Sequence, residues 1–491
     1  MKSTISNSLV FWAVVVLLGI APLPLGSNRP FFWAANGLLV AVITVVYLIT
    51  LMSDAGRLRA PLTALGAPMT LVVLAVVWMV IQIIPLPLDL FSLPPSVVTE
   101  VVPLQDVALP AIAHTGQISV DPSATLGMIV RYLTYALLCF LVVQTTVNPA
   151  RARRLVQAVF WIAVLHGAAG IVLLLELGDT LLVVPKWAYE GFATGFFVNR
   201  NSFATFMAFG ISAGAILAID AHAPGTGSNS SRKRGNPEVA QSLLVYAVGL
   251  AILGTAVVLS ASRMGALVSV LGIAVAFMIG AVRSKVRAGG IAIGLIAVAA
   301  LAAAVFLTAG GQLSDRLGSL ESNLDDRLLL YEQVVGMIKA HPWTGYGGGA
   351  FAAAFPLFHE LPLSADVTWD AAHNLYLELF AELGFAAVLP LLAVVILVVR
   401  SLRALAHPGV HWVAPATAVC LTVVAAVHSL VDFSLQIEAN VMLYIAVLAA
   451  GAAQFELVRR HVPTEAGEPP VPVRAGLPPL VEQFGGAPAG R

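Results

Sequence analysis

The chain has 491 residues, of which 59% are hydrophobic and only 11% are charged. Soluble domains carry about 25% charged residues, so this composition excludes an ordinary soluble protein and predicts an integral membrane protein. The formal net charge is zero, which argues against a nucleic-acid partner because phosphate binding needs a basic surplus. The two cysteines, Cys139 and Cys420, lie in apolar runs and predict neither a disulfide framework nor a metal site.

Apolar segments long enough to cross a bilayer recur along the whole chain. A span needs about 20 such residues. Windows of this kind predict twelve transmembrane helices, at 8–25, 32–52, 69–86, 125–147, 152–176, 200–220, 242–260, 264–281, 289–310, 375–399, 412–433 and 437–457. The first segment resembles a signal peptide, but the many segments after it favour a retained signal anchor. The predicted fold class is therefore all-α, a polytopic membrane protein.

The positions of the basic residues predict the orientation of these spans. With the N-terminus inside, 18 of the 26 basic residues fall on the cytoplasmic side, as the positive-inside rule requires. The other eight fall outside: Arg29, Arg131, Lys186, Arg200, Arg263, Arg316, Arg327 and Lys339. One missed or invented span would invert every later loop, so the bias supports twelve spans with both termini in the cytoplasm.

The connections divide the chain into a membrane domain, residues 1–458, and a Pro- and Gly-rich tail, 459–491, which is predicted to be disordered. The largest extracytoplasmic loop, 311–374, joins spans nine and ten. Within it, an amphipathic pattern predicts a helix over 325–340, capped by Asn323 and ended by Pro342. Gly345 and Gly347 then mark a segment that can turn sharply or let the backbone approach a ligand.

Three arginines lie at the extracytoplasmic edge of the membrane: Arg200 and Arg263 where spans begin, and Arg327 in the loop helix. A guanidinium there is costly unless it is paired or lines a wet cavity, and arginine binds phosphate oxygens with two prongs. Together they suit a pyrophosphate. Each also has an ordinary explanation, because Arg200 and Arg263 can reach lipid phosphates and Arg327 can pair with acidic residues of its own helix.

His373 precedes the tenth predicted span and is followed by Asn374 and Glu378. A histidine at this position can accept a proton from a hydroxyl, although a histidine taken alone is more often a structural helix cap than a catalyst. His428 and Asp432, one turn apart in a predicted span, are expected to pair with each other. What favours function is that the arginines, the histidine and the glycines gather on one side of the membrane.

At these residues the sequence resembles the O-antigen ligase and polymerase superfamily. The matching stretches are 195–204 (GFFVNRNSFA), 260–263 (SASR), 326–327 (DR), 342–351 (PWTGYGGGAF), 372–379 (AHNLYLEL) and 382–384 (ELG). The resemblance covers about 190–440 closely, and the earlier spans match in layout only. Residues 431–436 (VDFSLQ) and 438–440 (EAN) are similar to those of family members that polymerise exopolysaccharides.

This resemblance implies a bacterial inner-membrane glycosyltransferase without a metal or other cofactor, with its active site facing the periplasm. Its partners would be a glycan on undecaprenyl pyrophosphate, an acceptor hydroxyl on lipid A core or a growing polysaccharide, and membrane lipids. Paired arginines hold the pyrophosphate in such proteins, a role that falls on Arg200 and Arg263, and the catalytic histidine would be His373. The residues expected to shape the site are Asn199, Asn201, Arg327, Gly345, Gly347, Asn374 and Glu378. Transfer is expected to invert the anomeric carbon.

Two other classes of protein remain open at this stage. A lipid-linked oligosaccharide flippase would also have about twelve spans and interior arginines, but its charges would lie near the middle of the membrane and its halves would be related. A non-catalytic scaffold of an envelope complex would have no reason to gather arginine, histidine and glycine in one loop system. Within the family, ligase and polymerase share the site motifs, so the residues do not identify the acceptor.

Overall fold

A computed structural model describes residues 2–53, 58–87, 115–181, 184–222, 237–284, 313–364, 366 and 368–461. These residues form helices almost throughout, which confirms the all-α prediction. The strands are two residues each, β1 (Leu86–Pro87) and β2 (Thr115–Gly116), paired antiparallel. The α-helices are α1 (Lys2–Ile20), α2 (Pro30–Ser53), α3 (Gly66–Ile83), α5 (Pro122–Thr146), α6 (Pro149–Leu175), α7 (Arg200–His222), α8 (Pro237–Ser260), α9 (Arg263–Ser284), α11 (Leu313–Ala340), α12 (Phe351–Ala354), α13 (Leu375–Leu383), α14 (Val388–Ala406), α15 (Val413–His428), α16 (Glu438–Ala453) and α17 (Phe455–His461).

Nine helices of the described part are long and apolar enough to cross a membrane. Two shorter apolar helices, Asn7–Ile20 and Val413–His428, lie where the first and eleventh spans are predicted. The protein is therefore a multi-pass membrane protein. The predicted span at 289–310 lies outside the described residues.

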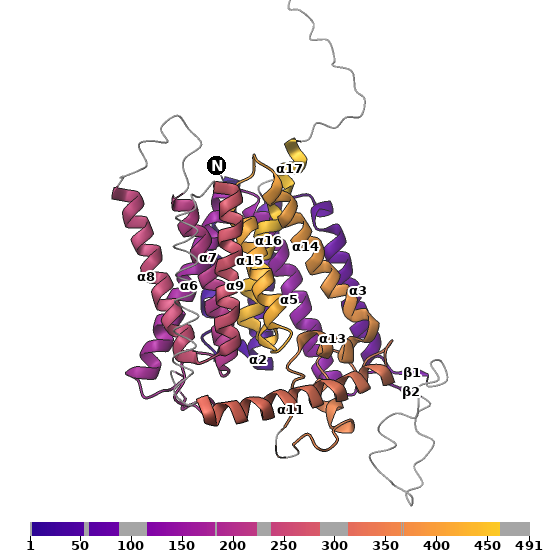
Figure 1. Cartoon of the computed structure of the whole chain (residues 1–491). Coiled ribbons are helices and arrows are strands. Elements are labelled where there is room, and N and C mark those ends of the chain that lie inside the picture. Colours follow the sequence, from indigo (N-terminus) through magenta and orange to yellow (C-terminus); the bar gives the residue numbers. More distant parts are fainter. Residues whose placement is uncertain are drawn as a thin grey trace, which may run out of the picture.

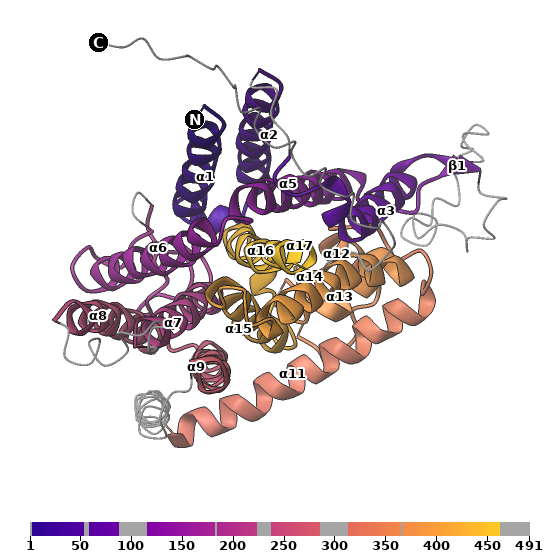
Figure 2. The same ribbon diagram turned by 90° about the horizontal axis from the view of Figure 1, so that it is seen from above.

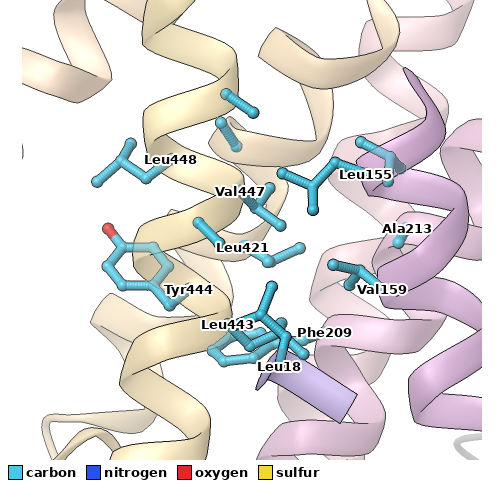
Figure 3. Packing of buried hydrophobic residues seen from close by; sticks show 14 of the residues in the cluster. Leu18, Leu155, Val159, Phe209, Ala213, Leu421, Leu443, Tyr444, Val447 and Leu448 are labelled. Atoms are coloured by element: carbon cyan, nitrogen blue, oxygen red, sulfur yellow. The ribbon is translucent and has the colours of Figure 1, made fainter. Parts of the chain in front are cut away.

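The helices form a bundle in which α7, α15 and α16 are the most enclosed (Figures 1 and 2). Helix α7 packs against α6, α8, α9 and α15, and α16 packs against α5, α14 and α15. Leu18, Val159, Phe209 and Leu443, from four different helices, meet in this interior (Figure 3). Close approach requires small residues: a Cβ on Gly210 would lie 2.3 Å from that of Ala163.

Helix α11 lies across one end of the bundle, at the end that also carries α13 and the strands (Figure 1). It is longer than the predicted helix 325–340, because it begins at Leu313. Asn323 therefore lies inside the helix, and the prediction that it caps the N-terminus is wrong. The helix ends at Ala340, just before Pro342, as predicted.

The tenth predicted span, 375–399, is broken into two helices. Helix α13 ends at Leu383, a 3₁₀ turn covers Gly384–Ala387, and α14 continues from Val388. Gly384 has φ 59°, and a Cβ there would meet the carbonyl oxygen of Trp343 at 2.5 Å. The loop after α11 thus packs against the junction between α13 and α14.

At the C-terminal end of the described chain, helix α17 includes residues 459–461, which were predicted to belong to the disordered tail. Residues 462–491 lie outside the described residues.

Candidate functional site

A cavity of about 970 Å³ opens among α2, α5, α13, α14 and α16. Its walls change character with depth. At the end where α2, α5, α7 and α13 begin, polar and aromatic residues line it: Asn28, Asp121, Trp187, Tyr189, Asn199, Asp370 and His373. Mostly apolar residues from the middle of helices, among them Ala136, Val394, Leu397 and Leu448, line the remainder, together with Arg131, Tyr135 and Tyr444. The cavity therefore suits a molecule with a polar head and an apolar tail.

His373 reaches this cavity from an unusual backbone conformation, with φ 50°. Its ring meets Phe433 edge-on, with centroids 5.1 Å apart, and its carbonyl oxygen accepts a hydrogen bond of 3.1 Å from the Tyr331 hydroxyl. The Nδ1 atom is buried and has no hydrogen-bond partner among the described residues. A strained residue held by its surroundings is frequent at functional sites.

The surroundings of His373 favour a neutral imidazole. Burial lowers the pKa of His373 below its ordinary value of 6.5; Asp432 opposes this effect, Arg327 adds to it, and Asp370 opposes it. Desolvation penalises the charged imidazolium. A neutral imidazole is the form that can accept a proton.

The residues after His373 hold its loop in place. Asn374 caps α13, because its Oδ1 accepts hydrogen bonds from the backbone N–H groups of Tyr376 and Leu377. Glu378 accepts a hydrogen bond of 2.8 Å from the Ala372 N–H and another from Gln436 Nε2. The structure thus places Glu378 beneath the His373 loop, and it also lines the cavity.

Arg131 is a cavity residue that the sequence pattern identified only as one basic residue among eight. It is 8% exposed, and its guanidinium lies 4.6 Å from the centroid of the Trp33 ring. Its Nε donates to the Tyr135 hydroxyl at 3.0 Å, and its Nη2 donates to the carbonyl of Gln436. The available signal was a charge within an otherwise apolar helix, which is costly and often functional.

A second polar cluster joins the starts of α7 and α9 to the segment after α15. Asn199 caps α7, since its Oδ1 accepts from the Asn201 N–H at 2.7 Å. Asn201 donates to Asp432 at 2.7 Å and accepts from the Ser262 hydroxyl at 2.9 Å. His428 does not pair with Asp432 as predicted: its Nδ1 lies 2.9 Å from the Thr205 hydroxyl.

The three predicted arginines lie beside this cluster rather than on the cavity wall. Arg200 stacks over Phe192 at 4.6 Å and over Tyr189 at 5.5 Å, and Arg263 is exposed next to Ser262. Burial and Asp432 raise the pKa of Tyr189, whereas Arg200 and Arg327 lower it, so these charges act on the same ring. The described arginines that line the cavity are Arg29 and Arg131.

The predicted glycines bring the loop after α11 against α13. Gly345 has φ 62°, and a Cβ there would lie 2.3 Å from the carbonyl oxygen of Glu382. The same carbonyl accepts a hydrogen bond of 2.9 Å from the Gly347 N–H, and Gly347 has φ 108°. These two glycines thus lie against protein backbone, and they support the helix that carries Glu378.

Among the described residues, no group of three His, Cys, Asp or Glu side chains is placed to hold a metal ion.

Comparison with protein-family models gives a match to part of the chain. Residues 248–392 match the family model described as O-antigen ligase. This stretch contains Arg263, Arg327, the glycine loop and His373, whereas Arg131 and Arg200 precede it. No curated protein matches the chain.

Proposed function

Because residues 248–392 match the O-antigen ligase family model, we propose that this protein is a ligase- or polymerase-type glycosyltransferase of the bacterial inner membrane. It transfers a glycan from undecaprenyl pyrophosphate to an acceptor hydroxyl at the periplasmic face, and its N- and C-termini are cytoplasmic. The acceptor is lipid A core or a growing polysaccharide.

The observation that supports this proposal best is the position of His373 at the polar end of a cavity whose deeper walls are mostly apolar. A lipid-linked glycan has the same division, since its sugars and pyrophosphate are polar and its polyprenyl tail is not. The polar end offers Asn, Asp, Trp and Tyr side chains, and the deeper part offers Ala, Val and Leu. A soluble nucleotide sugar has no apolar tail that could fill the deeper part of the cavity.

The proposed chemistry is one displacement at the anomeric carbon. The acceptor hydroxyl gives its proton to neutral His373 while its oxygen bonds to the anomeric carbon. The bond from that carbon to the pyrophosphate breaks, and its electron pair leaves with the phosphate. Arg200 and Arg263, which lie beside the polar cluster that includes the cavity residue Asn199, stabilise the negative charge that develops there, together with Arg327, because positioned cations favour the charged transition state. Attack opposite the leaving group inverts the configuration.

The test uses the purified protein in vesicles, with undecaprenyl pyrophosphate carrying a labelled glycan. Lipid A core and a second lipid-linked glycan are offered as separate acceptors. We expect covalent transfer to one of them, with inverted configuration at the new linkage, and a loss of about 10²- to 10⁴-fold in kcat for His373→Ala. Movement of the donor across the bilayer without a new glycosidic bond would identify a transporter instead.

A further inference from the structure

The segment that precedes α7 is held by an ion pair between a buried lysine and a partly buried aspartate. The Lys186 side chain is only 3% exposed and pairs with Asp179. Its Nζ also donates to the carbonyl of Phe192 at 2.6 Å, and the second carboxylate oxygen of Asp179 accepts from the Gly191 N–H at 2.6 Å. A buried cation with this many partners fixes the path of residues 184–199 (the Lys186 loop), as an unpaired charge would be costly to bury.

The Lys186 loop presents two aromatic side chains at the polar end of the cavity. Trp187 is 53% exposed and Tyr189 is 37% exposed, and both line the cavity together with His373. Tyr189 has φ 58°, and the Arg200 guanidinium lies 5.5 Å from its ring centroid. The ion pair and the cation–π contact thus hold the loop in a conformation in which both aromatic rings remain accessible.

The groups around these rings match a sugar better than they match lipid. Asp370 and Asp121 line the same end of the cavity. Asp370 is exposed, and one carboxylate oxygen of Asp121 is used to cap α5. Carboxylates accept hydrogen bonds from hydroxyl groups, and aromatic faces bind flat apolar surfaces such as the C–H face of a pyranose ring. An acyl chain would offer no hydrogen-bond donor to Asp370 or to the second carboxylate oxygen of Asp121.

We propose that Trp187 and Tyr189 form a stacking platform for a sugar ring of the glycan next to the reacting centre, and that Asp370 and Asp121 bind its hydroxyl groups. This inference rests on the proposed function and assigns a saccharide subsite within it. The ring belongs to the transferred glycan or to the acceptor glycan, which present the same chemistry.

The experiment measures KM separately for donor and acceptor in the full-length protein, for wild type, Trp187→Ala and Trp187→Phe. Trp343→Ala is the matched control, because Trp343 is 70% exposed at the same end of the protein but does not line the cavity. We expect Trp187→Ala to raise one of the two KM values roughly two- to tenfold, as an aromatic stacking contact is worth about 0.5–1.5 kcal/mol. Trp187→Phe should keep most of the affinity and Trp343→Ala all of it.

The substrate whose KM rises identifies the glycan on the platform. Inhibition by undecaprenyl pyrophosphate without a glycan tests whether Trp187 contacts the sugar or the lipid part of the donor. If Trp187 contacts the sugar, the inhibition constant of this lipid should not change in Trp187→Ala. Unchanged KM values for both substrates, an equal effect of Trp343→Ala, or a weakened inhibition constant would each overturn the platform while wild-type transfer continues. Absence of transfer by the wild type would instead contradict the proposed function.

Discussion

His373 combines a strained backbone, a buried ring and a place on the cavity wall. Burial lowers its pKa below 6.5, so the neutral base persists as the pH falls to that value. We expect kcat of transfer to decline as the pH falls, with the midpoint of the decline below pH 6.5, as protonation removes the base. The pH dependence of kcat checks this, with His373→Ala as control, whose residual rate should show no such decline. A decline centred above pH 6.5 would contradict the account.

Arg200 and Arg263 are the residues proposed to bind the pyrophosphate. Because hydrogen bonds to charged groups contribute about 1.5–3 kcal/mol, we expect Arg200→Ala and Arg263→Ala each to raise the donor KM roughly ten- to a hundredfold. The acceptor KM should stay constant. Lys339→Ala is a suitable control, since Lys339 is an exposed basic residue of α11. Initial rates over a range of donor concentrations check this. An equal rise of the donor KM in Lys339→Ala would contradict the assignment, because any loss of positive charge on this face would then have the same effect.

The contacts of Arg131 show which part of the site cannot be predicted from the sequence. A charge in an apolar helix is visible in the sequence and marks a candidate. Its acceptor, the carbonyl of Gln436, lies 305 positions later in the chain, and no local pattern predicts this contact. In contrast, the Asn374 cap of α13 and the Asn199 cap of α7 follow from local rules that place Asn before a helix.

Among the elements, α11 and α13 differ most from their predictions, and for different reasons. Residues 313–324 contain several charged and polar side chains, so they extend α11 without the apolar periodicity that revealed residues 325–340. The break after α13 occurs within a continuous apolar run, where hydropathy alone predicts an unbroken span. It requires Gly384 in a left-handed conformation against the carbonyl of Trp343, a contact made by another segment.

The packing of the glycine loop against α13 leads to a stability prediction. Gly345→Ala should destabilise the protein, because the left-handed conformation costs about 1–2 kcal/mol for a residue with a Cβ and that Cβ would lie 2.3 Å from the Glu382 carbonyl oxygen. Gly336→Ala, within α11, should instead stabilise it by about 1 kcal/mol, since a Cβ there meets no described atom within 4 Å. Thermal unfolding in detergent checks the pair. Equal midpoints would show that the loop does not support α13 in this way.

For the molecule as a whole, the spans and the positive-inside bias predict which loops face the periplasm. Both natural cysteines are buried, so new cysteines can report on topology. We expect Leu361→Cys, at a side chain that is 81% exposed, to react with a membrane-impermeant maleimide in intact cells. Gly409→Cys, in the connection between α14 and α15, should react only after the membrane is opened. The reverse pattern would invert the proposed orientation.

The most direct test of glycan transfer is the polysaccharide profile of a strain that lacks this protein. The strain is complemented with wild type or with His373→Ala, and the amount of each protein in the membrane is measured. We predict that wild type restores long glycans, whereas the variant leaves lipid-linked glycan to accumulate: as finished polymer for a ligase, as single repeat units for a polymerase. Full restoration by His373→Ala would contradict the account, because the proposed base would then be dispensable.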